Sequence, residues 1–245
     1  MPKELHEIEL KWQTFFNDDY RRNKKITRLT LLTKMSVSKN QSIGLILAGG
    51  KGSRMGFKDK PFLRIGGRTI AQWILSQSEK HIDEFLFSLK RNHIKYHQFG
   101  HKIVCDISEL STGPLIGIYS AMEFLYQKSG QNESTYILTF PGDVPFFPET
   151  LIPTLMHRLE KSALDVVVAR SEQHLQPLFA AWALSAREKV KEYINKGFVG
   201  PRQILPHLNH QVVFFETKSE LEFLNINTEQ DLKTAQYLTT NPLKN

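Results

Sequence analysis

An apolar strand-like run that leads directly into a glycine-rich loop constrains this chain more than any other feature of its sequence. The stretch LILAGGKGSRMGFKDKP spans Leu45–Pro61. Its glycines, at positions 49, 50, 52 and 56, permit positive φ values and a close approach of the backbone to a ligand, so that consecutive N–H groups can converge on one anion. Arg54 and Lys60 can neutralise the charge that those amides leave. The stretch therefore predicts a strand followed by a loop that binds nucleotide phosphates.

The spacing within this loop matches neither of two common phosphate-binding motifs. No GK[ST] follows a glycine at the spacing of a P-loop, and GKGSRMG has one residue too many for the dinucleotide fingerprint. A plain glycine turn between a strand and a helix is the structural alternative, because glycine-rich loops also occur without a function.

Strand-like and helix-like runs alternate from Ile43 onward, which favours parallel βαβ units and an α/β fold. The predicted strands are Ile43–Leu47, Glu84–Leu89, Lys102–Cys105, Tyr136–Phe140, Val166–Ala169, Val212–Phe215 and Phe223–Ile226. The predicted helices are Thr69–Ser78, Ile116–Gln127, Glu149–Leu159, Ala186–Ile194 and Glu229–Leu238. Thr228 is the expected N-cap of the last helix, with Asp231 in its acidic first turn.

The composition fits one α/β domain preceded by a basic extension. The chain has 245 residues, 40% of them hydrophobic, which allows a substantial core. Residues 1–42 hold nine Lys or Arg against five Asp or Glu, so they carry +4 of the total charge of +7. We predict that residues 1–42 are a basic, poorly ordered extension and that residues 43–240 form the folded domain. The remaining +3 suits anionic small molecules and gives no strong case for nucleic acid.

The sequence also indicates a compartment. Cys105 is the only cysteine, so no intrachain disulfide can form. No run approaches the ~20 apolar residues that cross a bilayer, and the N-terminus lacks the apolar segment of a secretory signal. We expect a cytoplasmic protein without membrane contact.

Four loops are expected at the carboxyl edge of the sheet, where open parallel sheets bind their ligands. They are Gly49–Lys60, Lys90–Asn92, Asp106–Pro114 and Gly142–Pro145. These loops hold the glycine-rich segment and two aspartates, so they predict one shared site.

The two aspartates have separate interpretations. Asp143 follows the apolar run YILTFPG and precedes Val144-Pro145, which places a hard oxygen ligand for Mg²⁺ at a strand end. An Asx-turn or a helix cap is the structural alternative. Asp106 ends the third predicted strand and could contact a base or ribose, act as a second carboxylate near the metal, or cap a loop.

Hydrolase and zinc chemistry have no support in the sequence. The nine histidines show no HExxH or other metal spacing, and no GxSxG motif is present.

Five segments together resemble a known family. LAGGKGSRMGFKDKP, DISELSTGPLIGI, FPGDVPF, LQPLFA and FLNINTEQDL, in this order, are similar to the molybdenum cofactor guanylyltransferases, relatives of the nucleotide-sugar pyrophosphorylases. The similarity covers about Ile43 to Leu238. It implies a Rossmann-like nucleotide-diphospho-sugar transferase fold, with a mostly parallel central sheet and helices on both faces.

The resemblance also implies an activity and its partners. The activity is transfer of GMP from GTP to molybdenum-molybdopterin, with Mg²⁺ as the metal and with a guanine dinucleotide cofactor and pyrophosphate as products. Residues 43–240 are then a nucleotidyltransferase domain. Other proteins of molybdenum cofactor biosynthesis and recipient molybdoenzymes are the further partners that it implies.

The same resemblance assigns roles by position. The nucleotide-binding positions that it implies are Leu47, Ala48, Gly49, Gly50, Gly52, Lys60, Ser88, Asp106 and Asp143. Asp143 is implied to bind both Mg²⁺ and GTP, and Arg54 and Lys60 are implied to act with it in catalysis. Ser88 stands where relatives often carry Asn in an NxNR pattern, because this chain has SLKR, with Lys90 two residues on. The late segment GFVGPRQIL also lacks the usual Arg or Lys after its first glycine pair.

Two other functions stay open at this point. A cytidylyltransferase acting on molybdenum cofactor, or on a sugar or isoprenoid phosphate, shares the fold, although related cytidylyl enzymes tend to show LAAG and RFG in place of LAGG and RMG. The other alternative is a catalytically silent nucleotide-binding regulator. The combination of Lys60, Asp106 and Asp143 argues against it, because a sensor need not keep both a cation and a metal ligand.

Overall fold

The computed structural model describes residues 41–50, 59–107, 113–129, 135–172 and 174–241. The predicted basic extension lies almost entirely outside these residues, and so do Gly52 and Arg54. The extension, and the domain boundary at residue 42, therefore stay predictions. The first strand begins at Gln41, two residues before the expected start.

Within the described residues, the central sheet has seven strands in the order β5-β4-β1-β6-β8-β7-β9. The strands are β1 Gln41–Leu47, β4 Glu84–Leu89, β5 Lys102–Cys105, β6 Thr135–Pro141, β7 Val166–Arg170, β8 Leu175–Ala183 and β9 His210–Phe214. β1 pairs in parallel with β4 and β6, and the pairs β4–β5 and β7–β9 are also parallel. β8 is antiparallel to both β6 and β7. A separate hairpin joins β2 (Arg64–Ile65) to β3 (Arg68–Thr69). The mostly parallel sheet predicted from the sequence is confirmed.

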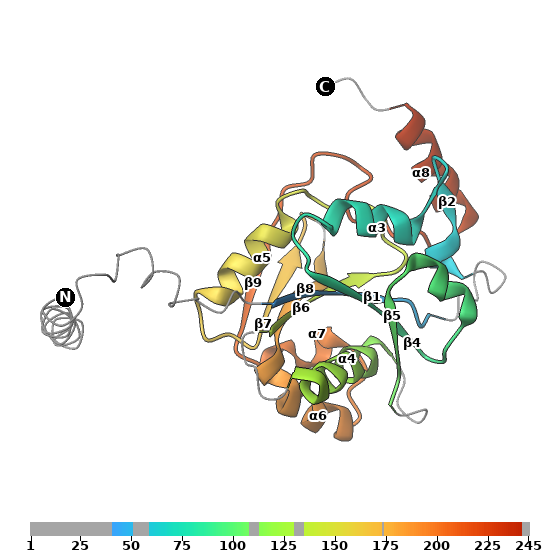
Figure 1. The fold of residues 1–245 in the computed structure, drawn as a ribbon. Helices are drawn as coiled ribbons and strands as arrows, with labels where there is room; N and C mark the ends of the chain where they lie inside the picture. Colours follow the sequence, from blue (N-terminus) through green and yellow to red (C-terminus); the bar gives the residue numbers. More distant parts are fainter. Residues whose placement is uncertain (1–40, 51–58, 108–112, 130–134, 173, 242–245) are drawn as a thin grey trace, which may run out of the picture. The chain divides into compact units, whose positions relative to one another are not determined.

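Helices cover both faces of this sheet, as predicted. They are α3 Ile70–Ser78, α4 Pro114–Ser129, α5 Leu151–Glu160, α6 Arg187–Asn195, α7 Pro201–Ile204 and α8 Glu229–Thr240, with 3₁₀ turns η2 Lys60–Phe62, η3 Ile94–Phe99, η4 Leu184–Ala186 and η5 Leu205–His207. In Figure 1, α3 and α5 lie above the sheet, and α4, α6 and α7 lie below it. Thr228 caps α8 as expected, because its hydroxyl accepts a hydrogen bond from the N–H of Asp231.

Each face of the sheet buries its own hydrophobic cluster. One cluster includes residues of α3 and α5, and the other includes residues of α4 and α6. Within β1, Ile43 and Leu45 belong to the α4 side and Ile46 to the α3 side. Burial on both faces explains why these strands are continuous apolar runs in the sequence. Polar functional groups are consequently concentrated in the loops at the strand ends.

The sequence prediction omits β8. A short turn connects β7 to β8, closed by a hydrogen bond from the N–H of Ser171 to the carbonyl of His174 (3.0 Å). Because antiparallel strands need no crossover helix, the alternation of strands and helices gives no sign of β8. Pro177 lies within β8 near a shift of register against β7, between Val168 and Ala169, where a missing N–H is tolerated.

The predicted strand Phe223–Ile226 is wrong. Phe223 lies in a turn with a φ of 63°, outside the extended region, and residues 224–226 have no regular secondary structure. Isolated backbone hydrogen bonds hold the segment, from the N–H of Phe223 to the carbonyl of Phe146 (2.9 Å) and from the N–H of Ile226 to the carbonyl of Asp143 (2.8 Å). Its apolar side chains therefore indicate burial rather than membership of the sheet.

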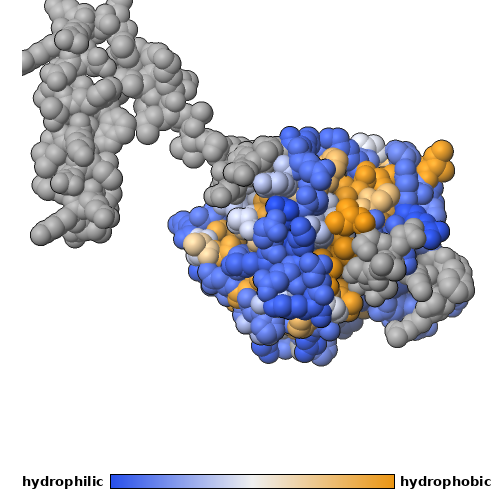
Figure 2. All heavy atoms as spheres, turned by 90° about the horizontal axis from the view of Figure 1, so that it is seen from below, coloured by the Kyte–Doolittle hydropathy of each residue, from blue (hydrophilic) through white to orange (hydrophobic). Residues whose placement is uncertain are grey.

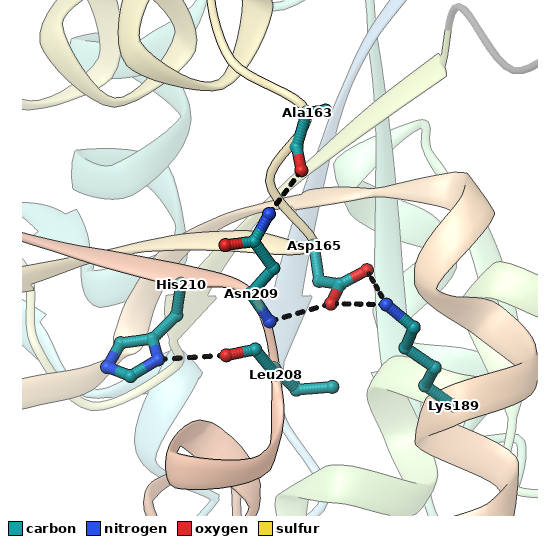
Figure 3. A network of polar contacts seen from close by, with 6 residues as sticks. All are labelled: Ala163, Asp165, Lys189, Leu208, Asn209 and His210. Carbon is teal, nitrogen blue, oxygen red and sulfur yellow. Dashed lines mark hydrogen bonds and ion pairs between the residues drawn. The ribbon is translucent and has the colours of Figure 1, made fainter.

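A polar network closes the opposite, amino-terminal edge of β7 (Figure 3). The carboxylate of Asp165 accepts hydrogen bonds from the ammonium of Lys189 on α6 (2.7 and 2.8 Å) and from the N–H of Asn209 before β9 (2.8 Å). The amide of Asn209 in turn donates to the carbonyl of Ala163 (2.5 Å). These contacts join α6 and the start of β9 to the start of β7, so their role is structural.

The face that carries α6 is mostly hydrophilic, with apolar residues gathered in one strip (Figure 2). In α6 the only fully buried residue is Val190, which agrees with a helix that packs along one narrow line. Within the described ranges, no helix combines the length and apolar character required to span a bilayer.

Candidate functional site

A cavity of about 390 Å³ opens at the carboxyl edge of the sheet. It lies beside β1, where the chain order in the sheet reverses, since β4 is on one side of β1 and β6 on the other. Such a switch point is the usual ligand site of open α/β sheets. Eight of the predicted site residues line the cavity: Leu47, Ala48, Gly49, Gly50, Lys60, Ser88, Asp106 and Asp143. The remaining two, Gly52 and Arg54, lie outside the described residues.

The loops after β1 and β6 are packed against each other. The N–H of Gly142 donates to the carbonyl of Leu47 (2.9 Å). A Cβ atom at residue 142 would lie 2.8 Å from that carbonyl oxygen and 3.0 Å from Cγ of Pro61, so only glycine fits there. This packing places Asp143, the next residue, beside the start of η2.

Lys60 joins the loops after β1 and β6 to the segment before α8. Its ammonium donates to Oδ2 of Asp143 (2.8 Å) and to Oδ1 of Asn227 (2.5 Å). The Lys60 and Asp143 side chains are only 17% and 23% exposed, so solvent screens this ion pair less than a surface pair. Asp59, which precedes Lys60, is itself held by the hydroxyl of the buried Tyr96 (2.6 Å). Lys60, Asp143 and Asn227, here called the Lys60 cluster, thus hold a cation at the β1–β6 side of the cavity.

Asn227 is a functional candidate that the sequence analysis missed. Its own N–H donates to Oδ2 of Asp231 (2.9 Å), and its neighbour Ile226 is bonded to the carbonyl of Asp143. These two hydrogen bonds therefore fix the backbone that carries the Asn227 side chain. The available signal was an amide side chain at the end of a run that was predicted to be a strand, directly before the capped α8.

Asp106 lies at the other side of the cavity, at the end of β5. Its N–H donates to the carbonyl of Leu89 (3.0 Å), which sets it beside the end of β4. Burial raises the pKa of Asp106 to about 6, and the nearby charge of Lys90 opposes this rise. The carboxyl is consequently ionised at neutral pH, at a cost to the folded state.

Ser88 lies on the cavity floor beneath α4. It is buried, and a Cβ at Gly117 would lie 2.3 Å from the Ser88 hydroxyl. The absence of a side chain at Gly117 lets α4 approach the end of β4, so that the backbone of α4 packs closely against the Ser88 hydroxyl.

Comparison with known proteins decides the family. A family model described as the MobA-like NTP transferase domain matches residues 44–212. The chain belongs to this family. A MobA-like NTP transferase is a nucleotidyltransferase, so the predicted enzyme class is confirmed.

Its relatives agree over most of their lengths. A molybdenum cofactor guanylyltransferase of Shewanella sp. (strain W3-18-1) is 29% identical over 205 residues, which cover 82% of this chain and 98% of that protein. A molybdenum cofactor guanylyltransferase of Haemophilus influenzae is 30% identical over 191 residues, 77% of this chain and 94% of that protein.

Solved structures confirm the predicted fold. Molybdopterin-guanine dinucleotide biosynthesis protein A from Archaeoglobus fulgidus has a TM-score of 0.63 at 23% identity, covering 81% of this chain and 98% of that one. The 4-diphosphocytidyl-2C-methyl-D-erythritol synthase of Anaerococcus prevotii has a TM-score of 0.61 at 16% identity, covering 84% and 98%. At these identities the matches establish the architecture that this MobA-like transferase shares with both proteins.

Replacement of Asn227 by alanine should weaken nucleotide use by this MobA-like transferase about tenfold in kcat/KM. The variant loses one charge-assisted hydrogen bond to Lys60, and bonds to charged groups contribute about 1.5–3 kcal/mol. Steady-state kinetics with nucleoside triphosphate varied will measure the change. Asn225→Ala is the matched control, because that exposed asparagine lies two residues away in the same segment. Equal activity of the Asn227 variant and this control would contradict a positioning role.

Replacement of Asp106 by asparagine should stabilise the nucleotide-free protein above pH 6. The folded-state pKa of Asp106 lies above its ordinary value of 3.8, so the cost of ionising it is absent below pH 3.8, grows up to about pH 6 and is complete above that. Because Asp106 is only half-buried, solvent screens the effect, and we expect a rise in melting temperature of at most about 2–4 °C. Melting curves at pH 4 and pH 8 will test this, and a gain of equal size at both values would contradict it.

Proposed function

We propose that this protein transfers GMP from GTP to molybdenum-molybdopterin, forming the guanine dinucleotide form of the cofactor and pyrophosphate. The names of its relatives support this substrate pair. The observation that carries the proposal is the ion pair of Lys60 with Asp143 in a cavity that the loop after β1 also lines, with Asn227 bonded to the same ammonium. We further expect, as the sequence predicted, that other proteins of molybdenum cofactor biosynthesis and recipient molybdoenzymes are partners.

The triphosphate is proposed to lie across the loop after β1. Amides of Gly49 and Gly50 and the ammonium of Lys60 would bind its phosphate oxygens. Arg54, predicted to share this task, lies outside the described residues and stays a prediction. The opposite side of the cavity, with Ser88 and Asp106, is left for the nucleoside.

The two side-chain oxygen atoms that surround the Lys60 ammonium fit the Mg²⁺ that the family implies. Oδ2 of Asp143 and Oδ1 of Asn227 already converge on one cation, the Lys60 ammonium. Mg²⁺ takes hard oxygen ligands and commonly needs only one or two from the protein, the others being waters and phosphate oxygens. No group of three or more His, Cys, Asp or Glu side chains gathers into a metal cage among the described residues. Asp143 and Asn227 would hold the ion, which when bound neutralises charge on the nucleotide phosphates.

The reaction that we propose is an in-line displacement at the α-phosphorus of GTP. An oxygen of the terminal phosphate of molybdopterin forms the new P–O bond, while the bond from the α-phosphorus to the oxygen that bridges it to the β-phosphate breaks and pyrophosphate leaves. The attacking oxygen is already ionised, so the chain need not supply a general base. Its contribution is to orient both substrates and to stabilise charge on the departing pyrophosphate through Lys60 and the loop amides.

One assay tests the proposal. The purified chain is incubated with molybdenum-loaded molybdopterin, Mg²⁺ and each of the four nucleoside triphosphates, and both pyrophosphate and the dinucleotide product are measured. We expect turnover with GTP to exceed that with the others. Preferred turnover of CTP would establish the cytidylyltransferase alternative, and GTP binding without turnover would establish the regulator.

A further inference from the structure

A second charged pair lies in the cavity, away from the Lys60 cluster. Lys90 follows β4 and Asp106 follows β5, and both line the cavity. The two strands are parallel neighbours in which Leu89 pairs with Cys105, and the N–H of Asp106 bonds to the carbonyl of Leu89 (3.0 Å). Lys90 and Asp106 are the next residues along the two strands, so a cation and a carboxylate are presented side by side.

The pair is poorly suited to phosphate. Asp106 is ionised at neutral pH, and its charge would repel a triphosphate that approached Lys90. Lys60 also has a carboxylate partner, Asp143, but we propose that this carboxylate holds Mg²⁺, whose charge would offset the repulsion of a triphosphate. Lys60 and Lys90, the lysines that line the cavity among the described residues, therefore suit different parts of one ligand.

The surroundings of the pair suit a planar base. Between it and the first turn of α4, the cavity is lined by Ser88, Gly113, Pro114 and Gly117, which offer small or apolar surfaces. In the sheet order β5-β4-β1, the pair lies on the β4–β5 side of the phosphate loop, whereas Asp143 follows β6 on the other side. A nucleoside whose phosphates reach Lys60 can therefore place its base beside Lys90 and Asp106.

From this juxtaposition we infer that Lys90 and Asp106 together read the guanine base, Lys90 by donating to O6 or N7 and Asp106 by accepting from N1–H and N2–H. Guanine alone among the four bases has two adjacent N–H donors, which match the two oxygens of one carboxylate. It also presents two neighbouring acceptors, which lysine commonly recognises. Adenine would set its exocyclic N–H₂ donor against the ammonium, and such mismatches give discrimination. The inference rests on GTP being the nucleotide donor, and it adds Lys90 as a specificity-determining residue.

Titration calorimetry of the Mg²⁺-containing protein without molybdopterin tests this inference. The two ligands are GTP and ribose 5-triphosphate, which has a triphosphate and a ribose but no base. Lys90→Met should weaken GTP binding about tenfold and change binding of the analogue by less than about twofold, because the wrong or missing base contact typically costs 1–3 kcal/mol. Lys90→Arg should retain the preference for GTP, and Lys80→Met, at an exposed site after α3, should change neither affinity.

The other outcomes are equally informative. Equal weakening of both ligands in Lys90→Met would mean that Lys90 binds phosphate, and unchanged affinities would mean that it binds neither; each result overturns the inference. Melting curves of all variants exclude misfolding as the cause, and Lys90→Leu, which also removes the charge, provides the same test if the methionine variant does not fold. Failure of the unmodified protein to bind GTP would instead count against the proposed function, so the two failures are distinguishable.

Discussion

Replacement of Asp143 by alanine should lower kcat/KM for nucleotidyl transfer by at least about 100-fold. The loss of one strong, preorganised electrostatic contact to the transition state typically costs 10²–10³ in rate. Asp143 is in addition the charged partner of Lys60, at 2.8 Å, so its removal also releases the cation that we propose to bind the phosphates. Steady-state kinetics with GTP and molybdenum-loaded molybdopterin will measure the effect.

Asp165→Asn is the matched control for this variant. Asp165 also binds a lysine, Lys189, at 2.7 Å, but it lies at the opposite edge of the sheet, before β7. We expect the control to lower the melting temperature and to leave kcat/KM within about twofold of the unmodified protein. Near-normal transfer by the Asp143 variant would remove Asp143 from the proposed site.

Replacement of Lys60 by methionine should raise the KM for GTP and lower kcat, with a combined loss of about 100-fold in kcat/KM. In the structure without ligand, the ammonium is bound to Asp143 and Asn227. We propose that these two oxygens would hold Mg²⁺, which would neutralise phosphate charge, and that the Lys60 ammonium would bind the phosphate oxygens of GTP. The variant loses both the charge and its hydrogen bonds, each of which contributes about 1.5–3 kcal/mol when charged groups take part.

Lys189→Met provides the comparison for Lys60→Met. Both lysines bind a carboxylate within 2.8 Å, but Lys189 lies on α6, outside the cavity. Initial rates at varied GTP will separate KM from kcat for both variants. If Lys60→Met and Lys189→Met have the same kinetics, Lys60 takes no part in nucleotide binding.

Much of the fold was predictable because its signals are local. Buried parallel strands such as β4 are continuous apolar runs, and their ends fell at the predicted residues, Glu84 and Leu89. Thr228 was recognisable as a cap because its chemistry acts over only three residues. The loops at the carboxyl edge followed from the strand ends alone, which is why eight predicted site residues line one cavity.

The errors occurred where local signals are ambiguous. Phe223–Ile226 has the composition of a strand, but it begins in a turn and continues without regular structure, so its apolar side chains reflect packing and not an extended backbone. β8 was missed because an antiparallel strand after a short turn breaks the alternation of strands and helices. Both errors touch the edge of the site, because Leu178 of β8 lines the cavity and Asn227 follows the misassigned segment, but the loops after β1, β4, β5 and β6 were placed correctly.

The sequence by itself determined the fold class, the family and the loops that gather at the cavity, because periodicity, glycines and caps act over a few residues. Only the tertiary structure decided which side chains meet there. Lys60 is 83 residues from Asp143 and 167 from Asn227, yet one ammonium binds both. Such contacts depend on the packing of whole segments, here on Gly142 against β1 and on the turn before α8. The pairing of Lys90 with Asp106 likewise required the register between β4 and β5, which no single segment encodes.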